Sequence, residues 1–189
     1  MELYHWQKKL LSLYNGVGII KVAPGGGKTL GAIQLIKHKK YKNVIVAVPT
    51  LPLISQWEKE LKKYNITASV HTYHFLSKDQ NHIECDLLVV DECHRSVSPV
   101  FKKLYKNISY KFVIGLSATP NEESEKFCGP IIIDVPFEDA NIADFKVVFT
   151  SVELTPRERI LYDRLSYSLQ RAIEERDEMF FSSWKEFKN

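Results

Sequence analysis

The sequence contains no apolar run long enough to cross a membrane. Its longest such runs, "NVIVAVP" and "DLLVV", fall far short of the roughly 20 residues that a membrane-spanning helix needs. The chain also opens without a cleavable leader. We therefore expect an intracellular protein with no membrane partner: cytoplasmic, nuclear if the cell is eukaryotic, or in the host cytoplasm if the gene is viral.

Cysteine is scarce as well. The three cysteines, Cys85, Cys93 and Cys128, are an odd number, and their spacing fits neither a disulfide framework nor a CxxC metal site. We expect ordinary reduced thiols. Repeats and low-complexity tracts are also missing, and 189 residues, 44% of them hydrophobic, suffice for one core with a small extension.

The net charge of +3 is unevenly distributed. Residues 1–111 hold 17 Lys and Arg against 8 Asp and Glu, a net +9, whereas residues 112–189 hold 9 against 15, a net −6. Lysine clusters in the first part are suited to a polyanion, because lysine beside phosphate releases counterions. A solvated helix face gives the same pattern, so no single cluster decides between the two.

Apolar β-branched runs alternate with helix-like stretches. The predicted strands are 17–22, 43–48, 87–90 and 112–116, and the predicted helices are 29–40, 52–64 and 98–107. The strands are apolar throughout, which is typical of parallel strands covered on both faces. The pattern predicts an α/β fold with a parallel sheet flanked by helices, and ligands bind such sheets at the carboxyl ends of the strands.

The stretch "KVAPGGGKTL" (21–30) follows the first predicted strand and begins a helix. In a phosphate-binding loop, backbone N–H groups converge on phosphate oxygens, and glycines permit the close approach. We expect Lys28 to reach the β- and γ-phosphates of ATP and Thr29 to bind Mg²⁺. The predicted nucleotide-binding loop is Pro24, Gly25, Gly26, Gly27, Lys28 and Thr29.

This loop departs from the generic GxxxxGKT pattern at its start. The pattern places glycine where this sequence has Val22, so we expect a tighter beginning of the loop. The alternative is a glycine-rich turn with a chance lysine. The strand before it and the helix after it favour nucleotide binding.

The stretch "CDLLVVDECHR" is an apolar strand that ends in two carboxylates. Asp91 at the strand's carboxyl end is suited to bind the Mg²⁺ that Thr29 also contacts. Glu92 is the predicted catalytic residue that orients and deprotonates the attacking water. Alone, such a pair is often a solvated loop, but together with the phosphate loop it predicts a nucleotide hydrolase.

A third strand, "KFVIGL", ends in "SATP". Ser117 and Thr119 lie at the same predicted sheet edge and can hydrogen-bond the Asp-Glu loop. By themselves they would be a polar turn before Pro120. Three strand ends with complementary chemistry favour a shared site.

"APGGGKT", "DECH" and "SATP", in this order, resemble motifs I, II and III of superfamily 2 DExH-box helicases and translocases, over roughly residues 3–120. The resemblance implies a RecA-like P-loop NTPase domain that uses ATP and Mg²⁺ and partners nucleic acid. Its details are closest to excision-repair and phage-type DNA helicases, which favours DNA over RNA.

The resemblance implies roles for further residues. Gln7, in "LYHWQKKLL", resembles the adenine reader of the Q-motif, with Tyr4 or Trp6 as an aromatic neighbour. His94 resembles the histidine that couples the nucleotide site to motif III, together with Ser117 and Thr119. "VIVAVPTLPLISQW" and "HTYHFL" resemble motifs that bind the nucleic-acid backbone, and the implied contacts are Pro49, Thr50, Thr72 and Tyr73. We expect Trp57 to serve in packing rather than base stacking.

Beyond Pro120 the expected elements are an acidic surface loop at "NEESEKFCG", strands at "PIIIDVP" and "FKVVFTSVEL", and a long helix. Thr155 is the predicted N-cap of that helix, with Pro156 at its first position and Glu158 closing a capping box. Its apolar stripe must be buried against some surface. The stripe consists of Ile160, Leu161, Leu165, Leu169 and Ile173.

The predicted division is a RecA-like ATP-binding domain over 1–138 and a connector with a C-terminal helical extension over 139–189. In the resembling families a second RecA-like domain follows and supplies arginine fingers, so we expect this chain to be one half of a longer helicase. Two other classes stay open: a non-unwinding nucleic-acid-binding accessory module with the same fold, and a P-loop NTPase or kinase of another class.

Overall fold

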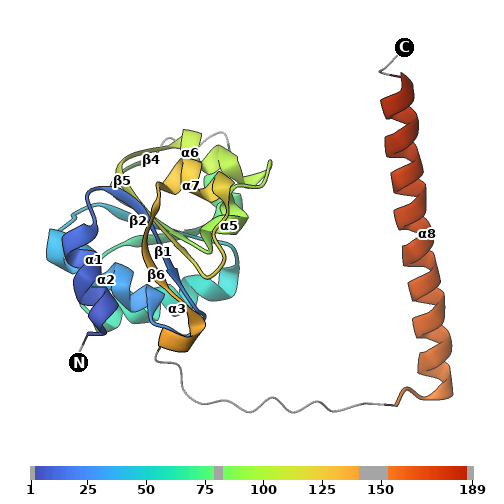
Figure 1. Cartoon of the computed structure of the whole chain (residues 1–189), viewed down its shortest axis with the longest axis horizontal. Coiled ribbons are helices and arrows are strands. Elements are labelled where there is room, and N and C mark those ends of the chain that lie inside the picture. Colours follow the sequence, from blue (N-terminus) through green and yellow to red (C-terminus); the bar gives the residue numbers. More distant parts are fainter. Residues whose placement is uncertain (1–2, 79–82, 141–152, 187–189) are drawn as a thin grey trace. The chain divides into compact units, whose positions relative to one another are not determined.

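The computed structural model describes residues 3–78, 83–140 and 153–186, the last range with side chains up to Arg171 (Figure 1). The chain divides into two compact units, 1–143 and 144–189. The domain boundary predicted after residue 138 stays a prediction, and Ala140 just after it is buried.

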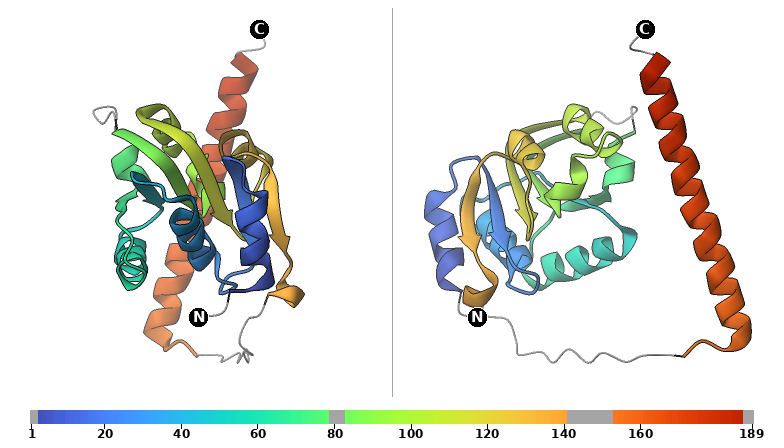
Figure 2. Two further views of the ribbon diagram at one scale, coloured as in Figure 1. Left: turned by 90° about the vertical axis from the view of Figure 1, so that its left-hand side faces the viewer. Right: turned by 45° about the vertical axis from the view of Figure 1, so that its right-hand side comes forward.

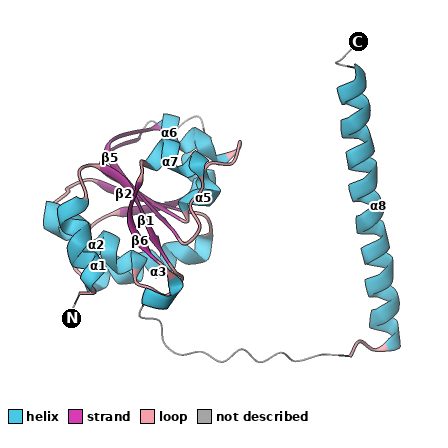
Figure 3. Ribbon diagram, viewed as in Figure 1, coloured by secondary structure: helices cyan, strands magenta, loops and turns pink. Residues whose placement is uncertain are grey.

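The first unit is built on a six-stranded sheet in the order β3-β2-β4-β5-β1-β6, with every pair parallel (Figure 3). The strands are β1 (Val17–Val22), β2 (Val44–Val48), β3 (Ser69–Thr72), β4 (Ile83–Asp91), β5 (Ile108–Ser117) and β6 (Ile131–Val135). All four strands expected before residue 120 are present. The structure therefore confirms the α/β class and the parallel sheet.

Successive residues along the central strands face opposite sides of the sheet and feed two separate cores. In β4, Leu87 and Val89 belong to one core, whereas Leu88 and Val90 belong to the other. Period-two alternation is what a strand imposes, and both sets are apolar because helices cover both faces (Figure 2).

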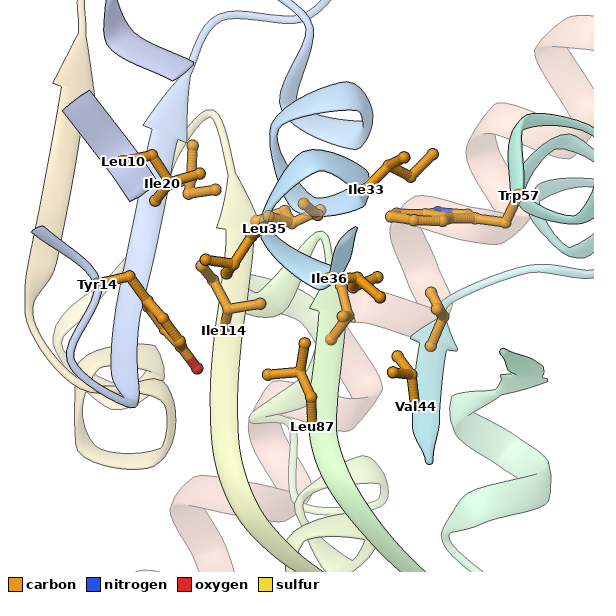
Figure 4. Packing of buried hydrophobic residues seen from close by; sticks show 14 of the residues in the cluster. Leu10, Tyr14, Ile20, Ile33, Leu35, Ile36, Val44, Trp57, Leu87 and Ile114 are labelled. Atoms are coloured by element: carbon orange, nitrogen blue, oxygen red, sulfur yellow. The ribbon is translucent and has the colours of Figure 1, made fainter. Parts of the chain in front are cut away.

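The first face is covered by α1 (His5–Leu13), α2 (Lys28–Lys39) and α3 (Leu51–Lys63). Figure 4 shows this core, in which the Trp57 ring of α3 extends toward Ile33 of α2 while Leu87 and Ile114 rise from the sheet. Trp57 is 1% exposed, which confirms its predicted place in the packing.

The opposite face is covered by short helices: α4 (Tyr73–Leu76), α5 (Cys93–Ser96), α6 (Leu104–Asn107) and α7 (Glu122–Cys128). The single helix expected over 98–107 is wrong, since a 3₁₀ turn, η1 (Phe101–Lys103), precedes α6. The acidic loop expected at 121–129 is also wrong. It is helix α7, because Asn121 and Ser124 form reciprocal hydrogen bonds that cap it.

After β6 comes a 3₁₀ turn, η2 (Phe137–Asp139), and the second unit contains α8 (Pro156–Glu186). As predicted, the Thr155 hydroxyl caps α8 by accepting from the backbone N–H of Glu158, and the Glu158 carboxylate accepts from the backbone N–H of Thr155. Ile160, Leu161, Leu165 and Leu169 are all more than half exposed. Within the described ranges no helix is long and apolar enough to cross a membrane. Most of the strand expected at 145–154 lies outside the described residues.

We expect Leu87→Ala to lower the free energy of unfolding by about 2 to 5 kcal/mol, because it opens a cavity in the middle of the sheet. Leu87 is 0% exposed, whereas Leu51 is 72% exposed. The matched variant Leu51→Ala should change stability by less than about 0.5 kcal/mol. Urea unfolding followed by circular dichroism measures both, and similar losses would contradict the core assignment.

Candidate nucleotide site

The register of the sheet aligns the ends of the strands that carry the predicted motifs. Ile20 of β1 pairs with Leu116 of β5, and Leu116 pairs with Asp91 of β4. The residues that follow each of these positions therefore leave the sheet along one edge. This edge is where the sequence predicts the nucleotide site.

The glycine loop lies between β1 and α2. Gly27 has φ 85°, a conformation that glycine adopts without steric cost, and it caps α2. A Cβ on Gly26 would lie 2.5 Å from Cγ1 of Val22. Because Val22 takes the space where the generic pattern has glycine, the loop requires glycine at position 26. The free N–H groups at the start of α2 make an anion site.

Lys28 is the first residue of α2, and its side chain folds back along the loop. Its Nζ donates to the carbonyl oxygens of Val22 at 2.8 Å and Ala23 at 3.3 Å, and the side chain is buried. Burial lowers the pKa of the ammonium, and the charges of Glu92 and Asp91 oppose this shift. The charges of Glu92 and Asp91 therefore act on Lys28.

Asp91 is the last residue of β4, and it is 7% exposed. Its Oδ2 accepts a 2.8 Å hydrogen bond from Nε1 of Trp57, and its backbone carbonyl accepts one from the hydroxyl of Tyr73. Burial raises the pKa of the carboxyl, whereas the Trp57 hydrogen bond lowers it. The charge of Glu92 adds to the rise, and that of Lys28 opposes it.

Glu92 has φ 53° and ψ 48°, the left-handed conformation that non-glycine residues seldom adopt. Strained backbone of this kind persists where the surroundings impose it, often at functional sites. The side chain is 35% exposed, so a water molecule can reach the carboxylate. The Asp91 carboxylate is thus buried and hydrogen-bonded to Trp57, whereas the Glu92 carboxylate is accessible to solvent.

The end of β5 contacts α5, the short helix that follows the Asp-Glu pair. His94 Nδ1 lies 2.8 Å from Oγ of Ser117 and 3.6 Å from Oε2 of Glu92. The backbone N–H of Thr119 donates to the same serine oxygen at 3.0 Å. The three residues predicted to couple the motifs are therefore brought together.

Gln7 lies behind the glycine loop. Its Nε2 donates to the carbonyl of Gly27 at 3.1 Å, its Oε1 accepts from the backbone N–H of Tyr4 at 3.1 Å, and the side chain is 0% exposed. Gln7 thus fixes the loop to α1. Tyr4, Gly27 and Thr29 line a hollow of about 310 Å³ beside it.

The predicted nucleic-acid contacts divide into two groups. Thr50 is exposed at the N-cap of α3, Pro49 before it is half-buried, and Thr72 caps α4 by accepting from the N–H of Phe75. The prediction for Tyr73 is wrong. Its side chain is 0% exposed and bonded to Asp91, so it cannot reach a backbone phosphate.

Sequence analysis did not predict that Trp57 and Tyr73 hydrogen-bond Asp91. Trp57 is 34 residues and Tyr73 is 18 residues away in the chain. Nothing in a tryptophan on an amphipathic helix indicates which group its N–H will meet. The only available signal was that a buried indole N–H needs an acceptor.

The donor groups at this edge fit Mg²⁺ and a triphosphate. Mg²⁺ prefers oxygen ligands, commonly one or two carboxylates together with phosphates. Asp91, Glu92 and the Thr29 hydroxyl are such oxygens, and the loop amides with Lys28 complement phosphate.

Comparison with known proteins identifies the family. The family model of the "Type III restriction enzyme, res subunit" matches residues 3–85 and 68–122, well over half of the chain. The chain belongs to this family. Its motifs and fold identify it as a RecA-like domain of a superfamily 2 helicase, which argues against a P-loop kinase.

One relative of this chain is the "DNA 3'-5' translocase XPB2" of Sulfurisphaera tokodaii. It is 27% identical over 184 residues, and the match covers 84% of this chain. The chain spans only 42% of that relative. The fold also resembles the Hef helicase domain of Pyrococcus furiosus, with TM-score 0.57, 20% identity and coverage of 71% of this chain and 39% of that one. It also resembles the UvsW helicase of bacteriophage T4, with TM-score 0.54 and 19% identity. That match covers 69% of this chain and 60% of the UvsW chain.

We expect Asp91→Asn to stabilise the protein without nucleotide by about 0.5 to 2 kcal/mol while weakening metal binding, since active-site charges are held at a cost in stability. The raised pKa means that ionised Asp91 lowers the free energy of unfolding above that pKa. The gain should therefore be present at neutral pH and should shrink as the pH falls through the raised pKa.

Urea unfolding at neutral and acidic pH measures this difference. Asp134→Asn is the control, because Asp134 is 52% exposed and pairs with Lys21 at the surface. It should give no gain. A loss of stability for Asp91→Asn at neutral pH would mean that Trp57 and Lys28 more than compensate for burying the charge.

Proposed function

We propose that this chain is the ATP-binding half of an ATP-dependent superfamily 2 motor that acts on DNA. The observation that carries the proposal is the convergence of motifs I, II and III on one sheet edge. Lys28 shares an electrostatic environment with Asp91 and Glu92, and His94 bonds Ser117. A P-loop turn with a chance lysine would not require the other two motifs there.

Each group at the edge has a role in phosphoryl transfer. The amides of the loop and of the first turn of α2 bind phosphate oxygens, and Lys28 exchanges its carbonyl partners for the β- and γ-phosphates. Thr29 and Asp91 would hold Mg²⁺, which when bound would supply positive charge to neutralise the phosphates. Glu92 accepts a proton from the water that attacks the γ-phosphorus, while the bond to the β-phosphate oxygen breaks.

The hydrogen bond between His94 and Ser117 offers a route from hydrolysis to movement. His94 lies close enough to the Glu92 carboxylate to respond to its surroundings. Ser117 in turn holds the backbone of Thr119. A change at Glu92 can therefore shift the turn after β5, which is how the coupling residues are proposed to act.

DNA is the proposed polymer because the translocase XPB2 is named for acting on DNA. Pro49, Thr50 and Thr72 are the proposed contacts, since each lies at or next to the N-terminus of a helix at the same sheet edge. Helix N-termini favour phosphate. The net +9 of residues 1–111 supports binding to a polyanion.

A second RecA-like domain from a longer chain is proposed to complete the site. The chain spans less than half of XPB2, which leaves room in that relative for another domain. We expect the isolated 189-residue chain to bind Mg²⁺ with ATP weakly and to hydrolyse it slowly, because a missing arginine finger costs about 10³- to 10⁵-fold in rate. Phosphate-release assays with and without duplex DNA measure this. Substantial DNA-stimulated turnover by the purified monomer would contradict it.

We expect Glu92→Gln to keep ATP binding and to slow hydrolysis about 10²- to 10⁴-fold, since the amide cannot accept the proton. Calorimetry measures the binding, and single-turnover phosphate release measures the chemical step even when turnover is slow. Glu123→Gln is the matched control, because Glu123 pairs with Lys126 on the surface of α7.

The control should hydrolyse at the wild-type rate. Equal rates for Glu92→Gln and wild type would remove Glu92 from the mechanism. ATP binding without any hydrolysis, even with the rest of a two-domain helicase supplied, would favour the non-unwinding accessory module.

A further inference from the structure

The core under α4 to α7 contains a pair of thiols. Cys93 is the first residue of α5, directly after Glu92, and Cys128 is the last residue of α7. Both side chains are 0% exposed, and both thiols are free. They are hydrogen-bonded to each other, a contact that lowers the pKa of the Cys128 thiol. Two sulfur atoms from different helices therefore lie side by side.

The strand beneath this thiol pair leaves room for it. Gly115 lies near the end of β5, and a Cβ there would lie 2.9 Å from Sγ of Cys93 and 3.1 Å from Cβ of Cys128. Glycine weakens the interior of a strand and often marks a position that another group approaches closely. The contact between the two thiols thus depends on the missing side chain at position 115.

Hydrogen bonds connect the thiol pair to a closed polar network inside an apolar core. Sγ of Cys128 lies 3.4 Å from the hydroxyl of Tyr105, which lies 2.6 Å from Oγ of Ser96. Ser96 in turn donates to the carbonyl oxygen of Cys93 at 2.7 Å. A cysteine that serves only in packing behaves as a small hydrophobic residue and needs no such partners. The network fixes the two thiols relative to α5 and α7.

We propose that Cys93 and Cys128 form a redox-sensitive site, which a peroxide converts to a disulfide that slows ATP hydrolysis by displacing Glu92. The site itself is independent of the proposed function. Only its effect on hydrolysis rests on that function.

The reaction needs a peroxide as oxidant, and hydrogen peroxide is the simplest. The sulfur of one thiol attacks one peroxide oxygen, the O–O bond breaks, and a sulfenic acid and water result. The sulfur of the other thiol then displaces the hydroxyl group as a second water and forms the S–S bond. The two sulfurs lose two electrons, and both peroxide oxygens leave as water.

Local opening gives the oxidant access to the buried thiol pair. α5 has four residues and α7 has seven, so few backbone hydrogen bonds hold either helix. Such elements open at a lower free energy than the central strands of a sheet. The third thiol, Cys85, lies in the central strand β4, where opening would break the sheet.

A disulfide at this position would move the backbone that carries Glu92. The S–S bond is about 2 Å long, much shorter than the contact between two unbonded sulfurs, so α5 and α7 must shift as it forms. Glu92 is the N-cap of α5 and has φ 53°, so its place depends on where α5 begins. A misplacement of about 1 Å at a reacting group costs about 10²-fold in rate.

The first experiment maps the bond in the folded wild-type chain. The protein is treated with hydrogen peroxide, the remaining thiols are blocked, and an unreduced digest is analysed by mass spectrometry. We expect a peptide that joins Cys93 to Cys128 and that disappears after treatment with a thiol reductant. If both cysteines are recovered as free thiols, as sulfinic acids or joined to Cys85, the proposal is overturned.

The second experiment measures single-turnover ATP hydrolysis before and after oxidation. We expect peroxide to slow the wild-type chain about 10²-fold and the reductant to restore the rate. Cys128→Ala should hydrolyse ATP at one rate with and without peroxide, because it cannot form the bond. Cys85→Ala is the matched control, since it removes another buried thiol and keeps the pair, and it should respond to peroxide as wild type does.

The outcomes separate this inference from the proposed function. If the reduced chain hydrolyses no ATP, the proposed function fails, and the peptide map alone decides whether the thiol pair is redox-sensitive. If the disulfide forms and hydrolysis keeps its reduced rate, the proposed function stands and the inference is refuted. A slowing by peroxide that persists in Cys128→Ala refutes it as well. The map uses the unaltered chain, so the test holds even when a variant fails to fold.

Discussion

The hydrogen bond between the Trp57 indole and the Asp91 carboxylate is the interaction on which the site depends. A carboxylate that is 7% exposed loses most of its hydration, and this favours the neutral form. The proposed role of Asp91 as a metal ligand requires the charged form. The Trp57 indole N–H and the nearby Lys28 ammonium lower the pKa of the carboxyl, and the Tyr73 hydroxyl fixes the backbone of the same residue. Core packing and site chemistry are therefore supplied by the same side chains.

The glycine loop must also accommodate the side chain of Val22. The generic pattern places glycine at the end of the first strand, whereas here Val22 is a fully buried core residue. The Val22 side chain fills the space beside Gly26, where the Cβ of any other residue would collide with it. Gln7 then fixes the loop from behind through the Gly27 carbonyl. A buried valine beneath the loop is thus accommodated by glycine at position 26.

Side chains from both faces of the sheet meet at the edge where we propose that the nucleotide binds. One face contributes Trp57, and the other contributes Tyr73 and the short helix α5 that follows Glu92. Ser117 at the end of β5 contacts His94 of α5. The helices α2, α3, α4 and α5 each follow a strand that ends at this edge, so helices on both faces of the sheet begin beside the acidic pair.

The sequence by itself determined five of the six strands, the helices α2 and α3, and the glycine loop and acidic pair that follow two of the strands, because these depend on local periodicity and on motifs of a few residues. It also determined the capping of α8 through Thr155 and Glu158. Only the tertiary structure decided that Tyr73 is a buried support rather than a nucleic-acid contact, and that Trp57 donates to Asp91. It also revealed that residues 122–128 form a helix, whose caps Asn121 and Ser124 were hidden in an acidic stretch. Contacts between residues far apart in the chain are set by how strands pair and helices pack, and no local pattern encodes them.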